Sequence, residues 1–192
     1  MYEKDKRDAA VLPFNLKKTV VLVGMMGSGK TAIGTALAQR LGVPFLDSDA
    51  EIVAASNMSI AEIFARDGET FFREKESQVL ARLLKGKPAI LSTGGGAFLQ
   101  PRNRELIAEQ GVSLWLRADL ELLWNRVRHK TTRPLLMTDD PYATLKEIFE
   151  ARDPIYAKAQ LAVDADASYS IEAMTDRVVS ALASHPDILE SS

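Results

Sequence analysis

The feature that most limits the fold is an alternation of short apolar runs with segments of helical periodicity. Five runs predict buried strands: Thr19–Val23, Pro44–Leu46, Ala89–Ser92, Val112–Leu116 and Leu161–Val163. Helices are expected from Thr31 to Gly42, from Ser59 onward, and over Phe71–Leu84, Pro101–Glu109, Asp119–Arg128, Tyr142–Tyr156 and Ile171–Ala183. This alternation predicts a three-layer α/β/α fold around a five-stranded parallel sheet, with ligands bound beyond the carboxyl ends of the strands.

Length and composition indicate one domain over residues 1–192, with a polar leader over 1–16 and a loose tail over 185–192. The net charge of −2 and pI of about 5.8 provide no basic field for nucleic acid or anionic membranes. The chain has no Cys, which excludes disulfides and thiolate metal sites. No apolar run reaches the roughly 18 residues of a membrane span, so we expect a cytoplasmic protein.

The run from Gly24 to Thr31 follows the first strand directly and has the pattern Gly-x-x-x-x-Gly-Lys-Thr. Glycines let backbone N–H groups curl around phosphate oxygens, and the helix that follows adds its positive N-terminal end. Lys30 supplies a charge for the β and γ phosphates, while the Thr31 hydroxyl is a hard oxygen ligand for Mg²⁺. The run therefore predicts a nucleotide phosphate site.

Charged residues follow the second strand and occupy a later helix. Asp47 and Asp49 stand two apart in a segment expected to be extended, so both carboxylates can face the phosphates, one toward a metal and one toward an acceptor hydroxyl. A helix N-cap followed by a solvated loop acid would have the same spacing. Arg73 and Glu76 share a helix face and suit a carboxylate substrate, although a surface ion pair would have the same spacing.

Two further segments allow a functional and a plain structural interpretation. Gly94–Gly96 after the third strand permits close approach to a ligand, or forms a flexible turn. The polar stretch from Arg126 to Asp140, which includes Arg133, is either a mobile lid carrying an arginine to the phosphoryl group or a solvated basic loop. Arg152 near the end of a helix is another candidate for anion binding.

Taken together, these segments resemble the shikimate kinase family from about Thr19 to Tyr156. Beyond the phosphate-binding run, the resemblance rests on five segments in the family's order: Phe45-Leu46-Asp47-Ser48-Asp49, Gly68-Glu69-Thr70-Phe71-Phe72-Arg73, Thr93-Gly94-Gly95-Gly96, Arg133-Pro134-Leu135-Leu136 and Arg152-x-x-x-Tyr156. Asn57 stands where the family commonly has Gly, and Asn tolerates the left-handed backbone well.

The resemblance implies a P-loop, nucleoside monophosphate kinase-like fold with a mobile lid over about 126–140. It also implies transfer of the γ-phosphoryl group of ATP to the 3-hydroxyl of shikimate, giving shikimate 3-phosphate and ADP in aromatic amino-acid biosynthesis. The implied ATP contacts are Gly27, Ser28, Gly29, Lys30, Thr31, Ala32, Arg126 and Arg133. The implied shikimate contacts are Asp49, Arg73, Glu76, Gly94, Gly95, Gly96 and Arg152, and Mg²⁺ would be held by Thr31 and, through water, by Asp47.

On this interpretation Lys30, Asp49 and Arg133 are the catalytic residues, and the protein works as a monomer on small molecules. Two other functions remain open: a P-loop kinase for gluconate or a nucleotide, and a non-catalytic shikimate-kinase-like binding module. Another small-molecule kinase has no need for Arg73, Gly94–Gly96 and Arg152 together. A degenerate scaffold is expected to have lost a catalytic residue or a substrate arginine, and none is missing.

Overall fold

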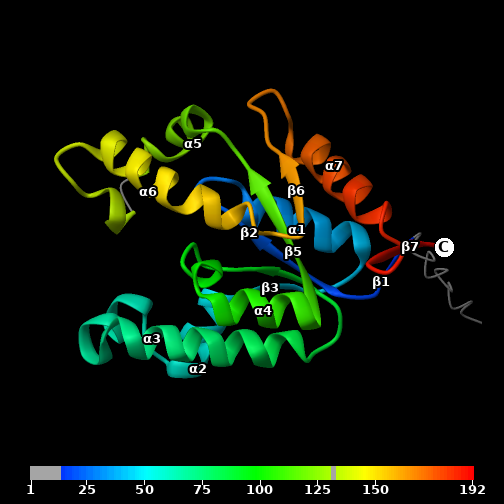
Figure 1. Ribbon diagram of the computed structural model, residues 1–192, viewed down its shortest axis with the longest axis horizontal. Helices are drawn as coiled ribbons and strands as arrows, with labels where there is room; N and C mark the ends of the chain where they lie inside the picture. The colour runs from blue at the N-terminus through cyan, green and yellow to red at the C-terminus, as the bar shows by residue number, and fades with distance from the viewer. Residues whose placement is uncertain (1–13, 131–132) are drawn as a thin grey trace, which may run out of the picture.

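The fold is built around a parallel sheet, shown in Figure 1. The computed structural model describes residues 14–130 and 133–192. Five parallel strands lie in the order β3-β4-β2-β5-β6: β2 (Thr19–Val23), β3 (Phe45–Asp47), β4 (Ile90–Ser92), β5 (Gly111–Arg117) and β6 (Leu161–Asp164). All five predicted strands are present within one residue of their expected bounds.

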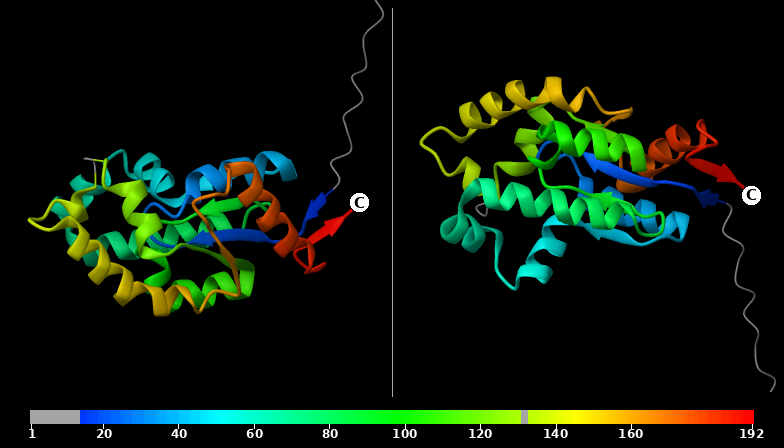
Figure 2. Two further views of the ribbon diagram at one scale, coloured as in Figure 1. Left: turned by 90° about the horizontal axis from the view of Figure 1, so that it is seen from above. Right: turned by 60° about the horizontal axis from the view of Figure 1, so that its bottom comes forward.

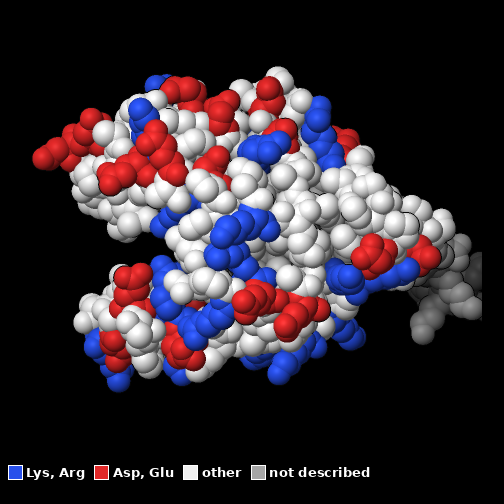
Figure 3. All heavy atoms as spheres, viewed as in Figure 1, with Lys and Arg blue, Asp and Glu red and all other residues white. Residues whose placement is uncertain are grey.

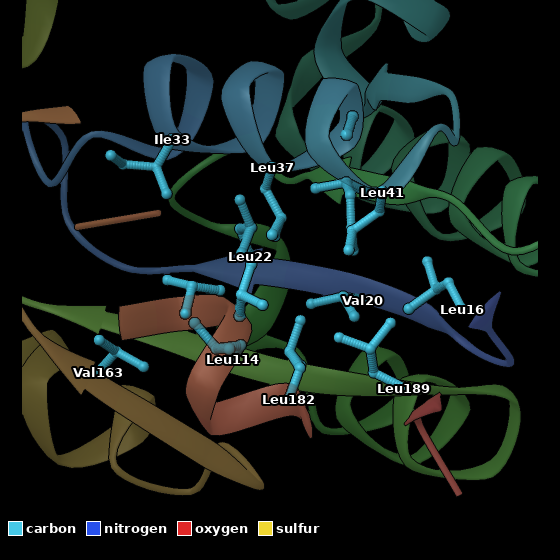
Figure 4. Close-up of a cluster of buried hydrophobic side chains, with 14 of the residues drawn as sticks. Leu16, Val20, Leu22, Ile33, Leu37, Leu41, Leu114, Val163, Leu182 and Leu189 are labelled. Carbon is cyan, nitrogen blue, oxygen red and sulfur yellow. The ribbon is translucent and has the colours of Figure 1, made fainter. Parts of the chain in front are cut away.

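The central strand β2 explains why the sheet is covered on both sides. All five of its residues are buried, as expected for a continuous apolar run in a parallel sheet. Val20 and Leu22 face a core formed with α1 (Lys30–Leu41) and α7 (Ile171–Ala183), which Figure 4 shows. Val21 and Val23 face the opposite core.

Four helices contribute to that opposite core: α3 (Ile60–Leu84), α4 (Pro101–Gln110), α5 (Leu120–Val127) and α6 (Pro141–Tyr156). The result is the predicted three-layer α/β/α arrangement. No helix within the described ranges is both long and apolar enough to cross a bilayer.

Local signals fix several helix ends. Ser59 caps α3 through a complete capping box with Glu62, as its sequence predicts. Asn57 adopts a left-handed conformation with φ of 54°, which confirms that it can replace a glycine there. Helix α3 is broken at Gly68, where φ is 83° and ψ is 172°. The two helices expected in this region therefore follow one another directly.

One expected extended segment is a helix instead. Helix α2 (Ser48–Ser56) begins immediately after β3, so Asp49 lies in its first turn rather than on a strand. The cause is Asp47, whose side chain accepts a hydrogen bond from the Ala50 N–H at 3.0 Å and caps the helix.

The expectation of a loose tail over 185–192 was wrong, and the predicted polar leader was placed to end too late, because residues 14–16 form a strand. β1 (Phe14–Leu16) pairs antiparallel with β7 (Leu189–Ser191), and Figure 2 shows the two strands together at one end of the molecule. Burial explains the pairing, since Leu16 and Leu189 are both inserted into the core beside α7. Residues 1–13 of the predicted leader lie outside the described ranges. Two short 3₁₀ helices, η1 (Ala97–Leu99) and η2 (Pro134–Leu136), complete the described structure.

Candidate active site

A single cleft of about 1250 Å³ collects all the predicted site residues. It lies beyond the carboxyl ends of the strands, where open α/β sheets bind their ligands. Figure 3 shows Lys and Arg side chains gathered along the hollow between the α5–α6 part and the α2–α3 part of the molecule. The lining includes Gly27, Ser28, Gly29, Lys30, Thr31, Ala32, Asp47, Asp49, Arg73, Glu76, Gly94, Gly95, Gly96, Arg126, Arg133 and Arg152.

The phosphate-binding run links β2 to α1 through a backbone that needs glycine. Gly27 and Gly29 have φ of 80° and 99°, a left-handed region that side chains disfavour. A Cβ on Gly27 would also lie 2.7 Å from the Val127 side chain, so α5 packs directly on the loop. Arg126, in the last turn of α5, donates a hydrogen bond to the Gly27 carbonyl at 3.0 Å.

Lys30 is the first residue of α1, and its ammonium group donates to the carbonyls of Gly24 at 2.7 Å and Met25 at 3.0 Å. Burial is the main cause that lowers the pKa of Lys30 to about 8, followed by the positive charge of Arg133. Asp49 opposes this shift. Burial and the charge of Arg133 thus disfavour the ammonium form of Lys30 while no anion is bound beside it, and a bound phosphate group would favour that form.

Hard oxygen donors stand beside the ammonium group. Thr31, Asp47 and Asp49, whose side chains carry a hydroxyl and two carboxylates, line the cleft together with Lys30. Burial, and then the charge of Asp47, raises the pKa of Asp49, while Arg73 and Lys30 oppose the rise. Mg²⁺ is usually held by one or two carboxylates together with substrate phosphates, so this donor set fits that ion.

The pair formed by Arg73 and Glu76 is not a surface ion pair. Arg73 Nη1 donates to Glu76 Oε1 at 2.9 Å, and the Glu76 side chain is only 1% exposed. Burial raises the pKa of Glu76, and the Arg73 guanidinium opposes the rise. The buried carboxylate therefore fixes the guanidinium at the wall of the cleft, where Arg73 keeps 21% of its side chain exposed.

The turn Gly94–Gly96, called the glycine turn below, is the point where the charged side chains converge. Each glycine lies where an added Cβ would collide with one charged group. A Cβ on Gly94 would lie 2.8 Å from Asp49 Oδ1, one on Gly95 2.8 Å from Arg152 Nη1, and one on Gly96 2.5 Å from both terminal nitrogens of Arg73. The absence of side chains on this turn thus allows one carboxylate and two guanidinium groups to meet in a small space.

Part of the segment predicted to be a lid lies at the same cleft. Arg133, Pro134 and Leu135 line the cleft, and Arg133 Nε is buried with no hydrogen-bond partner among the described residues. A buried guanidinium nitrogen without a partner is costly and suits a ligand acceptor. Residues 131 and 132 of the predicted lid lie outside the described ranges, and Arg126 at its expected start belongs to α5.

Sequence reasoning missed two groups of lining residues. The loop between β6 and α7, together with the start of α7, supplies Ala165, Asp166, Tyr169, Ser170, Ile171 and Met174. The second group consists of apolar residues of α3 that also line the cleft: Ile60, Ala61, Phe64 and Phe72. The first group follows the carboxyl end of a predicted strand, so the general rule for ligand sites contained the signal. The second group has no local signal, because apolar helix residues are usually core residues.

The fold and the site together define the class of P-loop kinases. The sheet is parallel, a phosphate-binding loop leads into α1, and a segment that carries Arg133 lines the cleft. A family model described as "Shikimate kinase" matches residues 26–183. The chain belongs to the shikimate kinase family.

Individual relatives agree with the family match. A shikimate kinase of Ruegeria pomeroyi is 67% identical over 92% of this chain and 91% of the relative. One of Cereibacter sphaeroides is 63% identical over 97% of this chain and 94% of the relative. The solved structure of a shikimate kinase from Acinetobacter baumannii in complex with shikimate superposes with a TM-score of 0.80 at 35% identity, covering 87% of this chain and 93% of that one.

Proposed function

We propose that this protein transfers the γ-phosphoryl group of ATP to the 3-hydroxyl of shikimate, giving shikimate 3-phosphate and ADP. The observation that carries the proposal is the convergence of Arg73, Arg152 and Asp49 on the glycine turn, beside the phosphate-binding loop. Shikimate bears one carboxylate and several hydroxyls. Two guanidinium groups suit the carboxylate, and Asp49 suits a hydroxyl.

The donor half of the site is proposed to hold ATP. Backbone groups of residues 27–32 would bind its phosphates, and Arg126 at the end of α5 would lie near the base. Thr31 and, through water, Asp47 would hold Mg²⁺, which supplies charge neutralisation at the phosphate oxygens when it is bound. Lys30 and Arg133 would neutralise the charge that develops on the transferred group.

In the acceptor half, Asp49 is proposed to orient the attacking hydroxyl and to accept its proton. Burial raises the pKa of Asp49, which makes it a better proton acceptor than a solvated carboxylate. Arg73, held by Glu76, and Arg152 would fix the substrate carboxylate. The segment around Arg133 would close as a lid and exclude the water that would otherwise hydrolyse ATP. We also propose that the protein works as a single-domain monomer in the cytoplasm.

The test is ADP release with Mg²⁺-ATP and one of three acceptors: shikimate, gluconate or nucleoside monophosphates. We expect ADP release when shikimate is the acceptor, and none with gluconate or nucleoside monophosphates. Turnover with gluconate or a nucleotide and none with shikimate would identify another small-molecule kinase. No ADP release with any acceptor, despite measurable shikimate binding, would identify a binding module. Size-exclusion chromatography with light scattering tests the monomer.

A further inference from the structure

Tyr156 is a buried polar group that the proposed mechanism does not use. It is the last residue of α6 and is 1% exposed. Its hydroxyl donates a hydrogen bond to the Gly95 carbonyl at 2.7 Å, across 61 residues of sequence. Its ring packs beside that of Trp115 on β5, with centroids 6.3 Å apart. A single hydroxyl thus joins the end of α6 to the glycine turn.

This bond sets the direction of one peptide group. The Gly95 carbonyl and the Gly96 N–H belong to the same planar trans peptide, so they point in opposite directions. Holding the carbonyl on Tyr156 therefore directs the Gly96 N–H away from the tyrosine. Among the described residues, the N–H groups of Gly94, Gly95 and Gly96 find no hydrogen-bond acceptor. They are free to meet a ligand in the cleft that they line.

Glycine residues make this peptide easy to rotate, which is why an external bond matters. Both residues of the Gly95–Gly96 peptide lack the Cβ that restricts other residues. Just after the turn, Asn103 on α4 donates to the Ala97 carbonyl at 2.9 Å and accepts from the Ser77 hydroxyl at 2.7 Å. Within the described residues, the Tyr156 bond is the one side-chain hydrogen bond to the backbone of the glycine turn itself.

The same peptide lies against both arginines of the acceptor half. A Cβ on Gly95 would collide with Arg152, and one on Gly96 would collide with Arg73. Arg152 is also one turn before Tyr156 on α6, so the residue that holds the turn and the residue that contacts it share one helix. Burial raises the pKa of Tyr156 above its usual range and the Arg152 side chain opposes the rise, so the hydroxyl is a proton donor at neutral pH.

We propose that Tyr156 is a positioning residue for the acceptor: its hydroxyl fixes the Gly95–Gly96 peptide and thereby preforms the surface on which Arg73 and Arg152 bind the shikimate carboxylate. This inference rests on the proposed function. Without the hydroxyl, the peptide populates orientations that do not bind the acceptor, and the apparent affinity falls by the fraction of molecules in the competent orientation. The donor half shares no contact with this bond and keeps its affinity for ATP.

The test compares Tyr156→Phe with Tyr142→Phe. The two tyrosines lie on the same helix and each donates to one acceptor at 2.7 Å, but Tyr142 bonds to Glu121 outside the cleft. For Tyr156→Phe we expect the KM for shikimate to rise about fivefold to tenfold, the effect of losing one buried hydrogen bond. The KM for ATP and kcat should stay within twofold of wild type. Tyr142→Phe should leave all three unchanged.

A purely structural role gives a different result. An equal rise in both KM values, or a lower Tm with both KM values unchanged, would assign the hydroxyl to the stability of the fold and overturn the proposal. A double-mutant cycle with Arg152→Lys gives a second readout, since residues that act on one ligand group have non-additive effects. Additive effects on the shikimate KM would contradict positioning through this site.

Wild-type turnover of shikimate is measured first and separates the two proposals. Its absence would overturn the proposed function and this inference together. If the wild type phosphorylates shikimate and Tyr156→Phe has the same KM for shikimate as the wild type, the positioning role alone is overturned.

Discussion

The replacement of Gly96 by alanine isolates the effect of one methyl group on the acceptor site. Gly96 has φ of −92° and ψ of −14°, which alanine adopts without strain, so the backbone has no reason to move. The new Cβ would lie 2.5 Å from both terminal nitrogens of Arg73. Ordinary contact begins at 3.4 Å, so the guanidinium must retreat by the difference, roughly 0.9 Å.

The displaced group is the end of a flexible side chain, so the folding cost is small and the functional cost is large. A misplacement of about 1 Å in a substrate-holding group costs about a hundredfold in rate. We therefore expect kcat/KM for shikimate to fall about a hundredfold in Gly96→Ala, with the KM for ATP unchanged. A guanidinium that moves while it keeps its 2.9 Å contact with Glu76 leaves the buried carboxylate paired, so stability changes little.

Gly86→Ala is the matched control, because its new Cβ would meet only the Leu83 carbonyl at 3.4 Å. The assay is steady-state ADP release with shikimate varied at saturating ATP and the reverse, with thermal unfolding measured on each variant. Equal kcat/KM values for Gly96→Ala and Gly86→Ala would refute the claim that the glycine turn is shaped around Arg73. A collapse of Tm in Gly96→Ala would refute the claim that the strain falls on a side chain.

Three further predictions concern charge and packing. The pKa of Lys30 is about 8, and a bound phosphate favours the charged form, so ATP binding above this pH takes up a proton. Isothermal titration should therefore show the Kd for ATP rising about tenfold from pH 7 to pH 9. A Kd that does not change with pH would contradict this. Asp49→Asn should lower kcat about 10² to 10⁴-fold. Its Tm should stay the same or rise, because the raised pKa of Asp49 means that folding disfavours the ionised carboxylate. Wild-type turnover in this variant would contradict the role of Asp49. Leu189→Ala should cost about 2–5 kcal/mol of unfolding free energy in a denaturant titration, with both KM values unchanged; unaltered stability would show that β7 contributes little.

Strands were predictable here because each carries its own local signal. The buried runs around Val21 and Leu114 are apolar on both faces, as a parallel sheet between two helix layers requires. The start of α3 was also predictable, since the bonds between Ser59 and Glu62 involve neighbours in sequence. Helix α2 was missed because the Asp47 cap and the short segment after it are equally typical of a loop.

The residues of the cleft were identifiable from sequence, but their arrangement was not. Spacing indicated that Arg73 and Glu76 share a helix face, yet only burial distinguishes this pair from a surface ion pair. The role of the glycine turn as the meeting point of Asp49, Arg152 and Arg73 depends on distances between residues far apart in sequence. The pairing of β1 with β7 is similar, because a three-residue strand has no local pattern that names a partner at the other end of the chain.

That terminal pair determines how the molecule responds to a pulling force. Phe14 lies opposite Ser191, and Leu16 lies opposite Leu189, so the outer ends of the two antiparallel strands are neighbours. A load applied through residues 14 and 191 separates the strands one hydrogen bond at a time rather than shearing several at once. The first surface that such traction uncovers is the apolar core beside α7, into which Leu16 and Leu189 are inserted. The pair is a sheet of its own, so under such a load it can part while the five-stranded sheet that carries the cleft is still intact.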